Sequence, residues 1–197
     1  MDLVNTTPAP AKGLVRAQDG TRIAYERYGD GPPLILVGET ARTGAGGERA
    51  LAALLARRFS VVAYDRRAGR EAREIDDLAA LVEAVCGESG TAAVHGTASG
   101  GALALAAAAA GVPVGPLSVY EPPCGTVDAG GLGRVHARVL VVDGGASPAG
   151  TRRAARTVAA AVPRGRHRTL TGQTHEVAPH VLAPVLADFY AEEPAGV

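Results

Sequence analysis

Apolar and polar residues follow two patterns along the chain, and the patterns succeed one another in a regular order. Short runs in which nearly every residue is apolar are typical of strands buried on both faces of a sheet. Such runs occupy residues 33–38, 59–65, 91–96, 116–122 and 138–145. Between the strands, apolar residues recur at helical spacing, most clearly over 75–85. Strands that alternate with helices predict an α/β domain with a mostly parallel sheet.

The two ends of the chain extend this order. Residues 14–33 predict a β-hairpin, because Asp19-Gly20 is a turn pair between stretches that alternate apolar and polar residues. The hairpin adds antiparallel strands at one edge of the sheet. A last strand is predicted near 167–170, and further helices near 48–57, 100–111, 148–162 and 177–190. We expect one domain over 13–197 after a loose segment 1–12, with helices on both faces of the sheet.

Composition narrows the class of protein. The chain has 197 residues, of which 47% are hydrophobic, and this is enough for one sizeable core. Its 20 basic and 20 acidic residues balance, with no stretch that concentrates either sign, so no nucleic-acid partner and no membrane partner are expected. The start of the chain lacks the pattern of a secretion signal, which predicts a soluble, cytoplasmic protein. Richness in Ala, Gly and Arg indicates a GC-rich, bacterial coding sequence.

One segment carries a pattern with a chemical meaning. Gly96-Thr97-Ala98-Ser99-Gly100 stands between a predicted strand and a small, apolar helix, which is where Gly-x-Ser-x-Gly presents a nucleophilic serine. With this segment, the sequence resembles the α/β-hydrolase superfamily along nearly its whole length after about Gly13. The resemblance is carried, in chain order, by DGTRIAYERYGDGPPLILVG, FSVVAYDRR, VHGTASGGALALA, SVYEPP and LTGQTHEVAP. It implies an α/β-hydrolase fold, whereas function depends on the individual site positions.

The resemblance puts Ala98 at the nucleophile position, and a methyl group cannot attack a carbonyl. A register shifted by one residue would make Ser99 the nucleophile, but β-branched Thr97 would then stand where the strained turn favours glycine. In relatives that read GHSSGG, the second serine matches Ser99 and lines the oxyanion hole with its backbone N–H. Both roles of Ser99 stay open, and natural divergence at Ala98 is favoured over an engineered change.

The resemblance also assigns an acid and a base. His175 in LTGQTHEVAP matches the general base, and an imidazole with a pKa of about 6.5 takes up a proton at neutral pH without a serine. Ser147 stands at the usual position of the acid. Glu121 in SVYEPP matches an alternative acid position, and Asp143 is the other candidate. His95 is predicted to be a packed strand residue.

The loop that would form the oxyanion hole is unusual. Gly38-Glu39-Thr40 follows the third predicted strand, and the N–H groups of Glu39 or Thr40 are predicted to form the hole with that of Ser99. A Glu39 carboxylate about 4 Å from an oxyanion would oppose it by on the order of 4 kcal/mol at an effective dielectric of about 20. Either Glu39 points away from the site, or the chemistry is not acyl transfer.

The segment where relatives insert a helical cap is short. Only 124–136 connects the strands SVYEPP and RVLVVDGG, so we expect no cap and an open site, or one covered by a second subunit in a homo-oligomer. Cys124 would lie at its mouth, as a structural thiol rather than a nucleophile. Cys86 and Cys124 are too few for a disulfide scaffold or a metal cluster, and no metal or other cofactor is expected.

Three hypotheses about function follow. The favoured one is a cofactor-independent enzyme in which His175, oriented by Glu121, is the general base on a small organic molecule. Proton abstraction, elimination or cyclisation, as on polyketide-like compounds of secondary metabolism, needs no covalent serine. The second is a non-catalytic pseudo-hydrolase that binds a small molecule or a protein partner. The third is a serine esterase or thioesterase that uses Ser99, His175 and Glu121.

Overall fold

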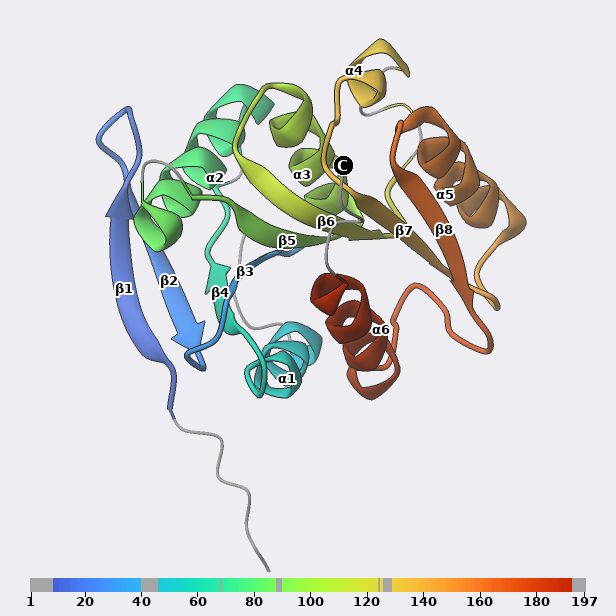
Figure 1. Cartoon of the computed structure of the whole chain (residues 1–197), viewed down its shortest axis with the longest axis horizontal. Helices are drawn as coiled ribbons and strands as arrows, with labels where there is room; N and C mark the ends of the chain where they lie inside the picture. The colour runs from blue at the N-terminus through green and yellow to red at the C-terminus, as the bar shows by residue number, and fades with distance from the viewer. Residues whose placement is uncertain are drawn as a thin grey trace, which may run out of the picture.

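A single mixed sheet of eight strands forms the centre of the protein (Figure 1). The computed structural model describes residues 9–39, 46–67, 69–87, 90–123, 125 and 129–192. The strand order is β1-β2-β4-β3-β5-β6-β7-β8, in which β2 pairs antiparallel with both β1 and β4, and the five remaining pairs are parallel. The bounds are β1 Ala11–Arg16, β2 Arg22–Tyr28, β3 Pro33–Val37, β4 Ser60–Tyr64, β5 Ala92–Thr97, β6 Val114–Tyr120, β7 Val139–Gly144 and β8 Gly165–Leu170. The predicted mostly parallel sheet with an antiparallel hairpin at one edge is confirmed.

Helices cover both faces of the sheet, as predicted. In Figure 1, α1 and α6 lie below the sheet, and α2, α3 and α5 lie above it. Successive residues of a strand point to opposite faces, so Leu34 of β3 packs in the core under α1 and α6, whereas Ile35 packs in the core under α2 and α3. The bounds are α1 Gly46–Leu55, α2 Glu71–Cys86, α3 Ser99–Ala109, α4 Ala129–Gly133, α5 Ala149–Ala161 and α6 Pro179–Ala191.

Two details differ from the prediction. Strand β1 begins at Ala11, inside the segment 1–12 that was expected to be loose, because it pairs with β2 up to Arg27. The short helix α4 was not predicted, since its sequence is rich in glycine. It is anchored by Leu132 and by the following Val135, which are 5% and 0% exposed. Within the described residues no cap domain covers the carboxyl ends of the parallel strands.

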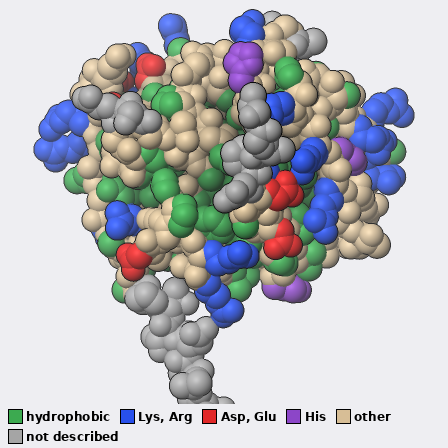
Figure 2. Space-filling view, viewed as in Figure 1, with side chains coloured by type: hydrophobic (Ala, Val, Ile, Leu, Met, Phe, Trp, Pro, Cys, Tyr) green, Lys and Arg blue, Asp and Glu red, His purple; other side chains and the backbone are tan. Residues whose placement is uncertain are grey.

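Charged residues are less evenly distributed along the chain than the sequence analysis stated, because one stretch is rich in arginine. Between Arg134 and Arg168 the chain carries a series of arginines and one carboxylate, Asp143. Part of this series lies on the edge strand β8, where charged side chains protect an unpaired strand from pairing with another chain. Lys and Arg side chains are prominent around the rim of the face in Figure 2, and hydrophobic side chains lie nearer its middle. Among the described helices, none is both long enough and apolar enough to cross a bilayer.

Candidate functional site

The turn between β5 and α3 holds Ala98 in a strained conformation. Ala98 has φ +47° and ψ −116°, a region that residues with a side chain rarely adopt. Its N–H donates to the carbonyl of Tyr120 on β6 over 2.8 Å, which fixes the turn to the sheet. The flanking glycines let the helix approach closely, because a Cβ on Gly100 would lie 2.0 Å from the carbonyl oxygen of Val37. The positive φ therefore falls on Ala98 and not on Ser99.

Glu121 occupies an equivalent place at the end of the neighbouring strand β6. It also has φ +47°, and its side chain is buried. Its Oε1 accepts the backbone N–H of Gly144 over 2.9 Å, and its Oε2 lies 2.9 Å from Nδ1 of His175. The fold thus brings together two predicted residues that are 54 positions apart in the sequence. A carboxylate has two acceptor oxygens. While Oε1 of Glu121 accepts the backbone N–H, Oε2 can accept an N–H of the imidazole.

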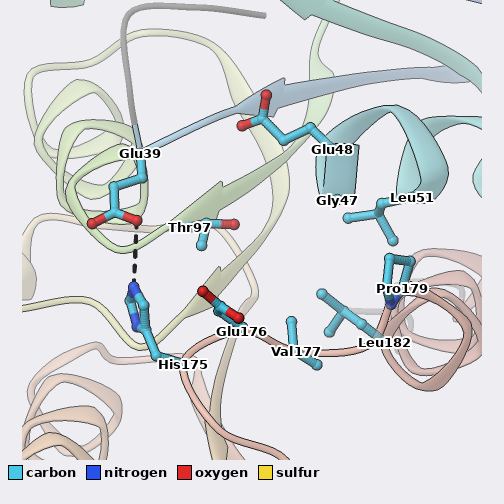
Figure 3. Close-up of a pocket in the computed structure, with 10 residues that line it drawn as sticks. All are labelled: Glu39, Gly47, Glu48, Leu51, Thr97, His175, Glu176, Val177, Pro179 and Leu182. Carbon is cyan, nitrogen blue, oxygen red and sulfur yellow. Dashed lines mark hydrogen bonds and ion pairs between the residues drawn. The ribbon is translucent and has the colours of Figure 1, made fainter. Parts of the chain in front are cut away.

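His175 lies in the loop between β8 and α6 and is 48% exposed. The hydrogen bond to Glu121 is the largest influence on its pKa, which is raised; burial lowers the pKa and a second bond, to Glu39, raises it again. This second bond joins Nε2 of His175 to Oε2 of Glu39 over 3.3 Å (Figure 3). The side chain of Glu39 therefore points into the site, toward the nitrogen that would face a substrate.

Ser99 is the first residue of α3, and its hydroxyl is bonded to other groups than His175. Its Oγ donates to the carbonyl of Glu39 over 2.8 Å and accepts from Nη1 of Arg66 over 3.2 Å. Arg66 also donates to the carbonyl of Gly38 and forms a 2.6 Å ion pair with Glu74. Sequence reasoning missed Arg66, although it lies in the quoted segment FSVVAYDRR. Its role is to tie the loop after β3 to the start of α3.

The other acid candidate lies outside this constellation. Asp143 is fully buried on the face of the sheet under α5, where Oδ2 lies 2.8 Å from Nε2 of His167. It precedes Gly144 by one residue, and the alternation of β7 turns it away from His175. Ser147, at the usual acid position, is buried in the loop after β7.

His95 is the packed strand residue that was predicted. It is 2% exposed, and its Nδ1 lies 2.8 Å from the hydroxyl of Ser118, which in turn contacts the hydroxyl of Tyr190. Burial lowers the pKa of His95 to about 4. The ring is therefore neutral at physiological pH and connects β5 to β6 and α6. Two other candidates, Thr40 and Cys124, lie outside the described residues.

Two cavities meet at the contact between Glu39 and His175, which line both. The first, of about 390 Å³, has an apolar side formed by α1 and the start of α6 (Figure 3). That side includes Leu51, Val177, Pro179 and Leu182. The second, of about 500 Å³, is lined by Ala98, Ser99, Glu121 and the beginning of α5, among others. Both volumes lie in the range of small-molecule sites.

The arrangement offers proton transfer at an open cavity. Its chemical groups are an imidazole held by a buried carboxylate, a second carboxylate beside it, and the N-terminus of α3, whose first N–H groups point outward. Within the described residues, no group of three or more His, Cys, Asp or Glu side chains could hold a metal ion.

Comparison with known proteins gives matches among solved structures. An alpha/beta hydrolase from Sphaerobacter thermophilus DSM 20745 has 32% sequence identity and a TM-score of 0.83, over 91% of this chain and 100% of that one. A serine hydrolase involved in carbazole degradation has 16% identity and a TM-score of 0.79, over 93% and 99% of the two chains. Est1E from Butyrivibrio proteoclasticus has 12% identity and a TM-score of 0.77, over 91% and 97%. No protein-family model and no curated protein matches the sequence.

Proposed function

The chain belongs to the α/β-hydrolase family, and we propose that it is an enzyme of that family that works without a covalent serine. In this proposal Ala98 stands at the position of the nucleophile, and His175, oriented by Glu121, is the general base on a small organic molecule. The chemistry is proton abstraction, elimination or cyclisation, as in lyases, isomerases and cyclases. No metal or organic cofactor takes part.

One observation carries the proposal. The carboxylate of Glu121 is buried, bonds Nδ1 of His175 over 2.9 Å, and lines the same cavity as the strained Ala98. Orientation by a carboxylate fixes the tautomer of an imidazole, so that Nε2 is the atom that exchanges protons with a substrate. This contact supports the proposal, because the proposed base and its orienting carboxylate lie beside the turn between β5 and α3 (the elbow), which carries only the methyl group of Ala98.

The oxyanion-binding groups of the proposal are the backbone N–H of Ser99 and that of Glu39 or Thr40. Ser99 begins α3, and the helix N-terminus favours negative charge, as on an enolate oxygen. The Ser99 hydroxyl is bonded to the loop after β3, which argues against its use as the nucleophile of an esterase.

A non-catalytic binding role is the second candidate function, because the carboxylate of Glu39 already occupies Nε2 of His175.

A fluorophosphonate probe tests the absence of an activated serine. After incubation with the probe, the intact mass of the wild-type protein should be unchanged, and the Ser99→Ala variant should behave in the same way. A stoichiometric adduct that maps to Ser99 would contradict the proposal and favour a serine esterase. Loss of turnover in His175→Ala, once a substrate is in hand, separates the enzyme from the binding protein.

A further inference from the structure

We propose that Glu39 is a second proton-transfer group of the site, and that Glu39 and His175 act together on an uncharged carbonyl compound. The proposal rests on the proposed function, because it assigns a partner to His175. From the sequence, the Glu39 backbone was expected to help form an oxyanion hole, and the direction of its side chain was left open. The structure instead places the carboxylate 3.3 Å from the ring nitrogen that faces the cavities (Figure 3).

The contacts of the imidazole fix how many protons the pair holds. A neutral imidazole has one N–H, and an ionised carboxylate only accepts hydrogen bonds. If Nδ1 of His175 donates its proton to the carboxylate of Glu121, a hydrogen bond between Nε2 and Glu39 needs one further proton. That proton lies either on Nε2, beside an ionised Glu39, or on Oε2, beside a neutral ring. The pair therefore holds one proton that can sit on either of two adjacent atoms.

Such a pair can catalyse enolisation without a change in its total charge. When the carbonyl group of a substrate enters between the two side chains, one partner takes a proton from the carbon next to the carbonyl. The other partner gives its proton to the carbonyl oxygen. A C–H bond breaks, an O–H bond forms, the C–H electrons become the C=C bond of the enol, and the pair ends in its other protonation state. Return of a proton to the same or a conjugated carbon resets the pair.

The pair is accessible enough for this insertion. The side chains of Glu39 and His175 are 51% and 48% exposed, and both line the two cavities. The 3.3 Å contact is long for a charge-assisted hydrogen bond, which typically spans about 2.7–2.9 Å, so a substrate displaces a weak bond rather than a strong one.

The charges around the pair select the substrate. The first cavity is lined by the carboxylates of Glu39, Glu48 and Glu176, which disfavour anionic ligands. Arg66 bonds to the carbonyl of Glu39, and its charge is balanced by the carboxylate of Glu74 at 2.6 Å. The opposite side of the cavity is apolar, from α1 and α6 (Figure 3). An uncharged ketone with a hydrocarbon skeleton fits these surroundings, whereas carboxylates and phosphate esters do not.

The first test follows exchange of the α-hydrogens of 2-tetralone for deuterium in D₂O by NMR. Wild-type protein should accelerate the exchange above the buffer rate, and both His175→Ala and Glu39→Gln should lose at least nine-tenths of the acceleration. Loss in His175→Ala but not in Glu39→Gln would overturn the role of Glu39 and leave the proposed function intact. No acceleration by the wild type on 2-tetralone, 1-indanone or cyclohexanone would overturn the assigned substrate class.

A second test needs no substrate. Glu39→Gln removes a carboxylate that bonds the ring, so the pKa of His175, followed by its ¹⁵N resonances, should fall relative to the wild type. Glu176→Gln is the matched control, because it removes the same charge from a neighbour that lines the first cavity, and its effect should be smaller. Equal effects of the two variants, or none, would overturn the pairing of Glu39 with His175.

Discussion

The ends of strands β5 and β6 share a positive φ angle but carry different side-chain chemistry. Ala98 and Glu121 each follow the last residue of the strand, each has φ +47°, and each donates its N–H to the next strand of the sheet. At the end of β6 this geometry delivers a carboxylate to His175. At the end of β5 it delivers a methyl group. The same positive φ thus carries a carboxylate at one strand end and a methyl group at the other.

This difference separates what the backbone of the candidate site provides from what its side chains provide. Backbone strain of this kind costs about 1–3 kcal/mol per residue and persists only where the surroundings impose it. At Ala98 the imposing contacts are its bond to Tyr120 and the tight approach of Gly100 to Val37. These contacts stabilise the turn whichever side chain stands on it.

Introducing a hydroxyl at position 98 should produce the largest change, because it would give the end of β5 a reactive side chain. Ala98→Ser places an Oγ above the His175–Glu121 pair, and we expect stoichiometric labelling by a fluorophosphonate, which intact mass measures, where the wild type shows none. Addition of His175→Ala should abolish the labelling, because the serine then loses its base. An unlabelled Ala98→Ser protein would mean that the elbow does not present position 98 to His175.

Removing the carboxylate at the other strand end should cost stability. Glu121→Ala leaves the N–H of Gly144 and Nδ1 of His175 without their acceptor. We expect the free energy of unfolding, measured with urea, to fall by about 1–3 kcal/mol. Glu121→Gln is the control, since its amide oxygen can still accept the N–H of Gly144, and it should cost less. An equal loss in both variants would show that these hydrogen bonds are not what stabilises the strand end.

Relief of the backbone strain at Ala98 should have the smallest effect of the three, a small increase in the stability of the fold. Ala98→Gly removes the side chain from a residue with positive φ, so the free energy of unfolding should rise by about 1 kcal/mol. The same substitution at Ala102, inside α3, should lower it by about 1 kcal/mol. A loss of stability in Ala98→Gly would indicate that the methyl contacts in the cavity outweigh the strain.

Sequence patterns predicted most of the fold because each element buries its own repeating face. The continuous runs of β3, β4 and β7 and the spacing from Ile75 to Val85 in α2 depend on local order alone. Helix α4 was not predicted, because three of its five residues are glycine. Its position depends on the burial of Leu132 and of the following Val135.

The site was predicted in part. His175 and Glu121 were found from the resemblance, and the structure brings them together. The direction of the Glu39 side chain could not be predicted from the sequence, because it depends on a histidine 136 residues away. The orientation of Asp143 could have been predicted, since strand alternation places its side chain on the face of the sheet opposite to that of Val142 and Gly144.

A titration of His175 by ¹⁵N NMR tests the central claim, that the carboxylate of Glu121 orients His175 as the general base. In the wild type the pKa should lie above the ordinary value of about 6.5, and Glu121→Gln should lower it. Because the folded-state pKa is raised, the pair stabilises the protein fully below about pH 6.5 and loses this contribution as the pH rises through the folded-state pKa. An ordinary pKa in the wild type, unchanged in Glu121→Gln, would contradict the account.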